Sequence, residues 1–151
     1  MLSVKHKSSG FTLIELLLVV SIVSIIGTFS VVFFSRFLTQ NAVANTQDQL
    51  IGQLRKAQIY AMMGRQNDSW GVVFQSNKII LFKGSSFAER DTAFDETFNE
   101  NANVLIPGFP EIYFTKTTGL PPSGSYPVTY SIFGNDSSKQ FTINSQGVVS
   151  R

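Results

Sequence analysis

Apolar and polar residues are unevenly distributed along the chain, and its N-terminal part is the more unusual one. Residues 16–35 carry no ionisable side chain, and Glu15 is the one ionisable residue within 11–35. These twenty uncharged residues, at ~1.5 Å of rise each, form a helix of ~30 Å, the thickness of a bilayer hydrocarbon core. The pattern therefore predicts a membrane-spanning helix over residues 11–35.

Beyond Arg36 the pattern changes from uniformly apolar to amphipathic. Five apolar residues recur at spacings of seven, four, three and four, which places them on one face of a helix: Val43, Leu50, Leu54, Ala57 and Ala61. Gly64 is a typical residue at a helix C-terminus. We expect one long helix from about Phe11 to Met63, with residues 36–64 as its amphipathic half. Two helices broken near residues 40–45 are the alternative.

After Gly64 the pattern becomes β-like. The predicted strands are 70–75, 78–83, 111–115, 128–133, 140–143 and 147–150, and Ser76-Asn77 is expected to form a two-residue hairpin turn. The acidic, weakly patterned segment 90–103 is predicted to be a surface loop. We expect an α+β fold in which the long N-terminal helix, first transmembrane and then amphipathic, packs on an antiparallel β-sheet. Residues 65–151 would form its β-rich globular head.

Charge does not indicate a nucleic-acid-binding protein. The formal net charge is +2, but two basic residues, Lys5 and Lys7, lie within residues 1–10. A chain that begins at Phe11 has 12 − 2 = 10 basic residues against 10 acidic ones. Arg55, Lys56 and Arg65 could form a local basic patch, but a solvated helix face is the simpler interpretation.

The residue types leave little room for catalysis. The chain has no cysteine, and its one histidine, His6, lies in the first ten residues, so thiolate chemistry, Cys-based zinc sites and a Ser-His-Asp triad are excluded beyond that segment. The acidic cluster of residues 89–100 lacks the ligand order of an EF-hand. We expect no catalytic residue, metal or cofactor. Phe87, Phe94, Phe98 and Phe109 are expected to pin a long loop to the sheet, with a subunit contact surface as the alternative.

Two general explanations of the N-terminus are incomplete. A secretory signal peptide could be cut after the small residues 42–44, but its apolar region would far exceed the usual ~7–15 residues. A plain signal anchor fits the length, and Lys5 and Lys7 would keep the N-terminus in the cytoplasm. It does not explain Glu15, because a carboxylate at the centre of a membrane helix costs ~2.5–3.5 kcal/mol and normally has a function.

The segment Gly10-Phe11-Thr12-Leu13-Ile14-Glu15 resembles the cleavage motif of type IV prepilins, with a small residue before an aromatic one and an acid four residues later. The resemblance implies a leader at 1–10, cleavage after Gly10 by prepilin peptidase and N-methylation of Phe11. Glu15, one helical turn on, would neutralise the new N-terminus of its own or a neighbouring subunit.

The rest of the chain resembles one branch of this superfamily, the H-type pseudopilins of type II secretion and the FimT-like minor pilins. The similarity lies in the helix segment 50–61, the strand start at Trp70, the strand before Gly119 and the closing hairpin 141–148. Many major pilins carry a proline in the apolar segment, and this chain has none there. The absence argues against a major pilin.

The resemblance implies a structural subunit of a type IV pilus or a type II secretion pseudopilus. Its expected partners are prepilin peptidase, other pilin or pseudopilin subunits, an inner-membrane assembly platform and, before assembly, membrane lipid. It would first be a single-pass inner-membrane protein with a cytoplasmic N-terminus and an external head, and then part of the filament. The alternative is a membrane-anchored or secreted binding domain for DNA uptake or a surface ligand. With only Lys139 and Arg151 basic among the last sixteen residues, we expect no nucleic-acid partner.

Overall fold

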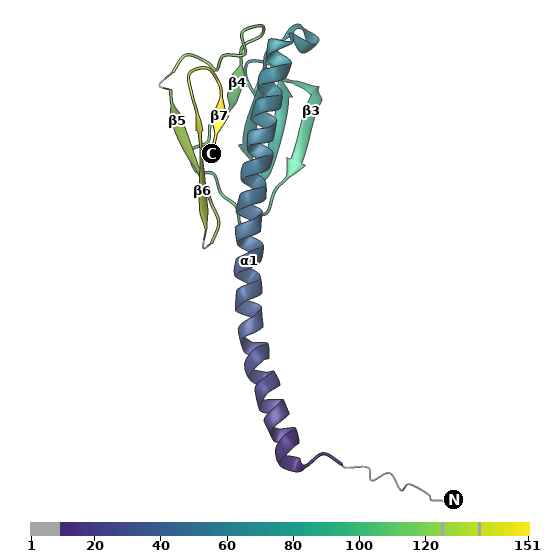
Figure 1. Ribbon diagram of the computed structural model, residues 1–151. Coiled ribbons are helices and arrows are strands. Elements are labelled where there is room, and N and C mark those ends of the chain that lie inside the picture. The colour runs from purple at the N-terminus through teal and green to yellow at the C-terminus, as the bar shows by residue number, and fades with distance from the viewer. Residues whose placement is uncertain (1–9, 125, 136) are drawn as a thin grey trace, which may run out of the picture. The chain divides into compact units, whose positions relative to one another are not determined.

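A computed structural model describes residues 10–124, 126–135 and 137–151, with the side chains of 29–36 left out (Figure 1). The segment 1–9, which holds most of the predicted leader and its basic residues, lies outside the described residues. Within them the chain forms the long helix α1 (Leu13–Met62), the 3-10 helix η1 (Arg65–Asn67) and seven strands. The predicted α+β class is confirmed.

Helix α1 is continuous, so the alternative of two helices broken near residues 40–45 is wrong. The chain nevertheless divides into two units, an N-terminal unit that ends at Phe37 and a second unit, Leu38–Arg151, which we call the head. The head contains the C-terminal part of α1 and all the strands, and its side chains form the core.

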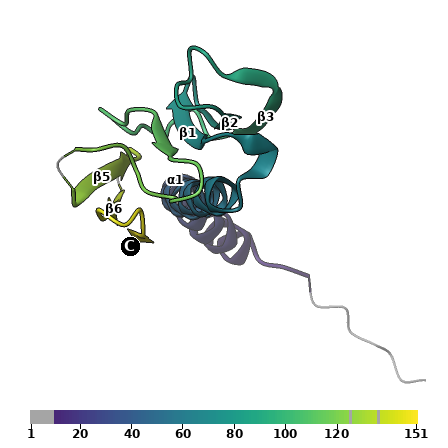
Figure 2. The ribbon, with the colours of Figure 1, turned by 90° about the horizontal axis from the view of Figure 1, so that it is seen from above.

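Two antiparallel sheets flank the head's part of α1 (Figure 2). The first has the order β3-β2-β1-β4 and the second the order β5-β6-β7. The strands are β1 (Trp70–Gln75), β2 (Lys78–Lys83), β3 (Asp91–Asn99), β4 (Ile112–Phe114), β5 (Val128–Phe133), β6 (Ser138–Ile143) and β7 (Val149–Ser150). The expected sheet is thus two sheets. The predicted strands are found with shifts of at most two residues at their ends.

The amphipathic face of α1 supplies one side of the core, as its spacing predicts. The five residues of the predicted stripe are fully buried, together with large side chains from both sheets. Trp70 lies against Tyr60 with ring centroids 4.9 Å apart in an edge-to-face arrangement. Each sheet therefore has its own contact with the helix, and the helix joins them into one core.

The prediction of a loop over 90–103 is wrong, because most of this segment is strand β3. It pairs with β2 in the register Ile79↔Phe98 and Leu81↔Glu96, with an irregular shift between Leu81 and Lys83. The acidic residues occupy exposed or half-buried positions on this edge strand, which hides the alternation in the sequence.

The four phenylalanines that were expected to pin this region do contact the rest of the head. Phe94 and Phe98 are half-buried against the core. Phe87 lies 5.6 Å from the ring of Phe82, and Phe109 lies 5.1 Å from that of Tyr130. They hold a strand and its flanking turns to the core.

Candidate processing and assembly site

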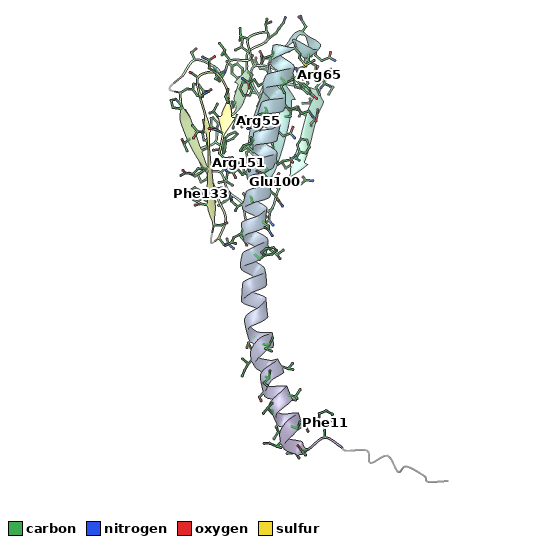
Figure 3. All side chains as sticks on the ribbon, in the orientation of Figure 1. Phe11, Arg55, Arg65, Glu100, Phe133 and Arg151 are labelled. Carbon is green, nitrogen blue, oxygen red and sulfur yellow. The ribbon has the colours of Figure 1, made fainter. Side chains whose placement is uncertain are left out.

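The predicted cleavage site lies just before the start of α1. Gly10, Phe11 and Thr12 precede the first helical residue, Leu13. A Cβ placed on Gly10 would meet nothing within 4 Å, and the Phe11 side chain is 79% exposed (Figure 3). The bond between Gly10 and Phe11 is therefore open to a peptidase that requires a non-helical, accessible segment.

Thr12 and Glu15 form a reciprocal capping arrangement at the first turn of α1. The Glu15 N–H donates to the Thr12 hydroxyl at 3.4 Å, and the Thr12 N–H donates to a Glu15 carboxylate oxygen at 3.5 Å. This is a capping box, which satisfies two backbone donors that the helix leaves free. Sequence reasoning missed Thr12, although the T-x-x-E spacing was a sufficient signal.

The capping box gives Glu15 a partner within its own chain. In the uncut precursor the nitrogen of Phe11 is an amide and carries no charge, and the Glu15 carboxylate serves the helix end instead. Cleavage after Gly10 would create an ammonium group one turn away from this carboxylate. The pairing of Glu15 with a subunit N-terminus stays a prediction.

Apolar side chains at the start of α1 are largely exposed. The large apolar residues between Leu13 and Ile26 are 48–79% exposed. The hydroxyls of Ser21, Ser24 and Thr28 donate to helix carbonyls three or four residues earlier, at 2.7–3.1 Å. Because these hydroxyls are satisfied locally, the helix surface is compatible with an apolar environment.

The membrane-spanning helix over 11–35 stays a prediction. Among the described residues, no helix is both long and apolar enough to cross a membrane.

The acidic cluster in and around β3 is largely neutralised by the chain's own cations. Two ion pairs link it to neighbouring elements, Lys56–Glu96 at 2.5 Å and Lys83–Asp91 at 3.4 Å, and a third is local, Arg90–Asp95 at 2.8 Å. In the part of the chain that the structure describes, no three His, Cys, Asp or Glu side chains come together as metal ligands would. These carboxylates act as structural partners for basic residues.

The three residues of the possible basic patch, Arg55, Lys56 and Arg65, likewise have partners within the head. Arg55 donates to the Val149 carbonyl at 3.0 Å, and the Arg65 guanidinium lies 4.0 Å from the ring centre of Tyr60. The hydrogen bond to Glu96 raises the pKa of Lys56, against a smaller lowering by burial. This arrangement favours packing within the head over binding of a polyanion.

Two open hollows of about 650 Å³ each lie on the head. One is lined by Tyr113, Tyr126 and the Pro121-Pro122 turn, and burial raises the pKa of Tyr126. The other lies between Asn45 on α1 and the end of β3. Neither lining contains a histidine, a lysine or a cysteine.

Comparison with known proteins gives one result that bears on the N-terminus. A family model of the prokaryotic N-terminal methylation motif matches residues 5–31, a stretch that includes Gly10, Phe11 and Glu15. No curated protein and no solved structure matches the chain. The motif, at the start of a long helix that packs on antiparallel sheets, marks the chain as a type IV prepilin-like protein.

Proposed function

We propose that this chain is a non-catalytic structural subunit, a minor pilin or pseudopilin, of a type IV pilus or a type II secretion pseudopilus. The observation that carries the proposal is the methylation motif over 5–31, followed by a helix whose apolar side chains are largely uncovered. At roughly 25 cal/mol per Å² of apolar surface, leaving these side chains in water is strongly unfavourable. They need lipid or other helices around them.

The first stage of this function is residence in the inner membrane. The uncharged run 16–35 is long enough for the hydrocarbon core, and Lys5 and Lys7 favour a cytoplasmic N-terminus. The head would then lie outside the cytoplasmic membrane. An inner-membrane assembly platform would later transfer the subunit into the filament.

Processing is the second stage. Prepilin peptidase would cut after Gly10 and methylate the amine of Phe11, both of which lie in an exposed segment. The same apolar helix would exchange lipid for the helices of neighbouring subunits. Glu15 would supply the charge that pairs with a subunit N-terminus and sets the axial register.

The absence of proline from the apolar segment supports a minor rather than a major subunit. The body motifs around residues 50–61, Trp70 and Gly119 support the branch of H-type pseudopilins and FimT-like minor pilins. The Trp70 strand start and the strand before Gly119 are neighbours in the first sheet, as β1 and β4.

Mass spectrometry of the protein recovered from a host with prepilin peptidase tests the proposal. We expect a mature N-terminus at Phe11 carrying one methyl group, and a Gly10→Val variant that retains residues 1–10. An N-terminus at Asn45, or an uncut wild-type chain, would show that the proposed processing is wrong.

The proposed pairing of Glu15 with a subunit N-terminus can be tested separately from its contribution to the helix cap. Gln at this position keeps a capping acceptor but carries no charge, so Glu15→Gln should insert into the membrane normally and yet fail to enter filaments. Glu89→Gln, on the head, is the matched control and should assemble like the wild type. If the Glu15→Gln variant enters filaments normally, the charge of Glu15 has no role in assembly and the residue acts only as a helix cap.

The alternative is a secreted binding domain released by cleavage after Ala44, and the position of that site in the fold disfavours it. Ala44 lies inside α1, and Val43, immediately before it, is fully buried in the core of the head. Cleavage there would remove part of the helix that covers the second sheet.

A further inference from the structure

One pair of exposed apolar residues in the head is held in a fixed position by the backbone. Leu105 and Phe133 form an isolated antiparallel bridge. The Leu105 N–H donates to the Phe133 carbonyl at 2.9 Å, and the Phe133 N–H donates to the Leu105 carbonyl at 2.8 Å. Their side chains are nevertheless 58% and 44% exposed. The head thus presents two rigidly placed apolar side chains to its surroundings.

A mostly apolar groove continues this surface. It has a volume of about 390 Å³ and is lined by Phe74, the turn 75–77 and residues 105–107. The Asn77 side chain donates to the Val104 carbonyl at 3.3 Å, which ties the turn to the Leu105 segment. Lys78 follows the turn, and Lys139 follows Ser138, the residue that pairs with Phe133 across β5–β6. We call Leu105, Phe133, Lys78 and Lys139 the basal rim.

The basal rim lies at the end of the head where the chain enters it. A Cβ on Gly134, next to Phe133, would lie 2.9 Å from the Thr39 side chain and 2.6 Å from that of Val43. Thr39 is the second residue of the head. Phe133 and Glu100 lie toward this end, and Arg65 lies at the opposite end (Figure 3).

Covalent reach limits how far the rim can be from the membrane. Arg36 is the first charged residue after the uncharged run, so in the proposed anchoring it marks the bilayer interface. The three residues from Arg36 to Thr39 span at most ~11 Å even when fully extended. The headgroup layer itself is ~5–8 Å thick. In the proposed anchoring, these lengths bound the distance between the lipid surface and the part of the rim next to Gly134.

Charge and polarity of the rim suit a lipid surface. Among the described residues neither Lys78 nor Lys139 forms an ion pair, and both are exposed. Glu100 is the acidic residue nearby, and its carboxylate accepts a hydrogen bond from Thr46 at 2.6 Å; Asp136 lies outside the described residues. Apolar side chains flanked by lysines are typical of segments that rest at the headgroup boundary.

We propose that, before assembly, the basal rim rests on the lipid surface, with Leu105 and Phe133 at the headgroup boundary and Lys78 and Lys139 near the phosphates. This inference rests on the proposed membrane anchoring of residues 11–35. The contact orients the head on the membrane, and it is given up when the subunit leaves the bilayer for the filament.

Site-directed fluorescence in vesicles tests the proposal, and the chain has no native cysteine to interfere. Full-length Leu105→Cys and Phe133→Cys variants are labelled with a nitrobenzoxadiazole dye and reconstituted in vesicles of phosphatidylethanolamine and phosphatidylglycerol. Met63→Cys is the matched control, because Met63 is apolar and 76% exposed but follows the far end of α1. We expect a headgroup-spin-labelled lipid to quench the dye at 105 and 133 at least twofold more than at 63.

The possible outcomes separate this inference from the proposed function. Variants that float with the vesicles and resist extraction by high salt, yet show equal quenching at all three positions, overturn the rim contact and leave the anchor intact. Crosslinks between copies at position 133 without lipid quenching would identify the rim as a subunit contact instead. A chain that fails to remain with the vesicles would contradict both the anchor and the rim contact.

Discussion

Single glycines decide how closely the turns of the head approach α1. Gly147, in the turn before β7, has φ +76°, and a Cβ there would lie 2.6 Å from the Gln58 side-chain nitrogen and 2.9 Å from the Phe114 ring. Gly108 has a similar φ of +69°, but a Cβ there would meet nothing within 4 Å. Alanine substitutions at Gly108 and Gly147 therefore distinguish the cost of backbone strain from the cost of steric crowding.

We expect Gly108→Ala to lower the free energy of unfolding by about 1–2 kcal/mol, from the left-handed backbone alone. Gly147→Ala should lower the free energy of unfolding by about 1–3 kcal/mol more than Gly108→Ala does, because the added methyl group must displace Gln58 or Phe114. Urea unfolding of the full chain in detergent, followed by the fluorescence of the buried Trp70, measures both. Equal losses would mean that the turn can move away from the helix.

The Lys56–Glu96 ion pair links α1 to the edge strand β3 and gives the head a pH dependence. Its hydrogen bond raises the pKa of Lys56 above the ordinary value of 10.5. Because the folded-state pKa is the higher one, the pair stabilises the head fully below pH 10.5 and loses that effect as the pH rises through the folded-state pKa.

We therefore expect Glu96→Gln to be less stable than the wild type at neutral pH, with a difference that shrinks above about pH 10.5. Burial also raises the pKa values of Tyr126 and Tyr130, but both chains contain them, so their effect cancels in the comparison. Urea midpoints from pH 7 to 12 would show the trend. A constant difference over this range would exclude Lys56 as its source.

Among the secondary-structure elements, the terminal hairpin is attached to α1 by hydrogen bonds from helix side chains, and Gln58 connects it to the first sheet as well. The Gln58 amide nitrogen donates to the Gly119 carbonyl at 3.0 Å and to the Gln146 carbonyl at 2.8 Å. It thereby joins the turn after β4, in the first sheet, to the turn between β6 and β7, in the second. Arg55 adds a bond to Val149 from the same helix.

Replacing Gln58 by Met keeps its length but removes the donor, and should lower the free energy of unfolding by about 1–2 kcal/mol, mainly through the partly buried Gly119 carbonyl. Amide hydrogen exchange should accelerate at Gly147 and Val149 more than in β1. Gln75→Met, at an exposed position at the end of β1, is the control and should change neither. Uniform acceleration through the whole head would indicate global destabilisation instead of local release.

At the scale of the whole molecule, the hydrophobic core is confined to the head. All residues of the described hydrophobic core lie between Val43 and Val149, while the apolar side chains of the N-terminal unit are largely exposed. The head should therefore not need the N-terminal unit to fold.

A chain that begins at Leu38 should unfold cooperatively with the same urea midpoint, by Trp70 fluorescence, as the full chain in detergent. A chain that begins at Ala44 loses Val43 and the helix turn that contacts Gly134, so its stability should fall by about 1–3 kcal/mol. A Leu38 chain without a cooperative transition would show that the N-terminal unit supports the fold.

Local patterns were sufficient for much of this protein. The uncharged run, the cleavage motif and the buried stripe of α1 are properties of neighbouring residues, so the sequence reveals them directly. The turn at Ser76-Asn77, with φ of 52° and 57°, is local in the same sense. The T-x-x-E cap at Thr12 is equally local, because both of its hydrogen bonds join residues three apart.

Contacts between distant residues were decided only by the tertiary structure. Strand β3 exists because Phe94 and Phe98 reach the core and its acidic residues pair with Lys56 on α1 and Lys83 on β2. The division into two sheets and the basal rim likewise depend on pairings such as Leu105 with Phe133. The periodicity of a segment indicates which of its faces is buried. Which strand pairs with an edge strand, and which residue completes an ion pair, depends on contacts between segments that are distant in the sequence.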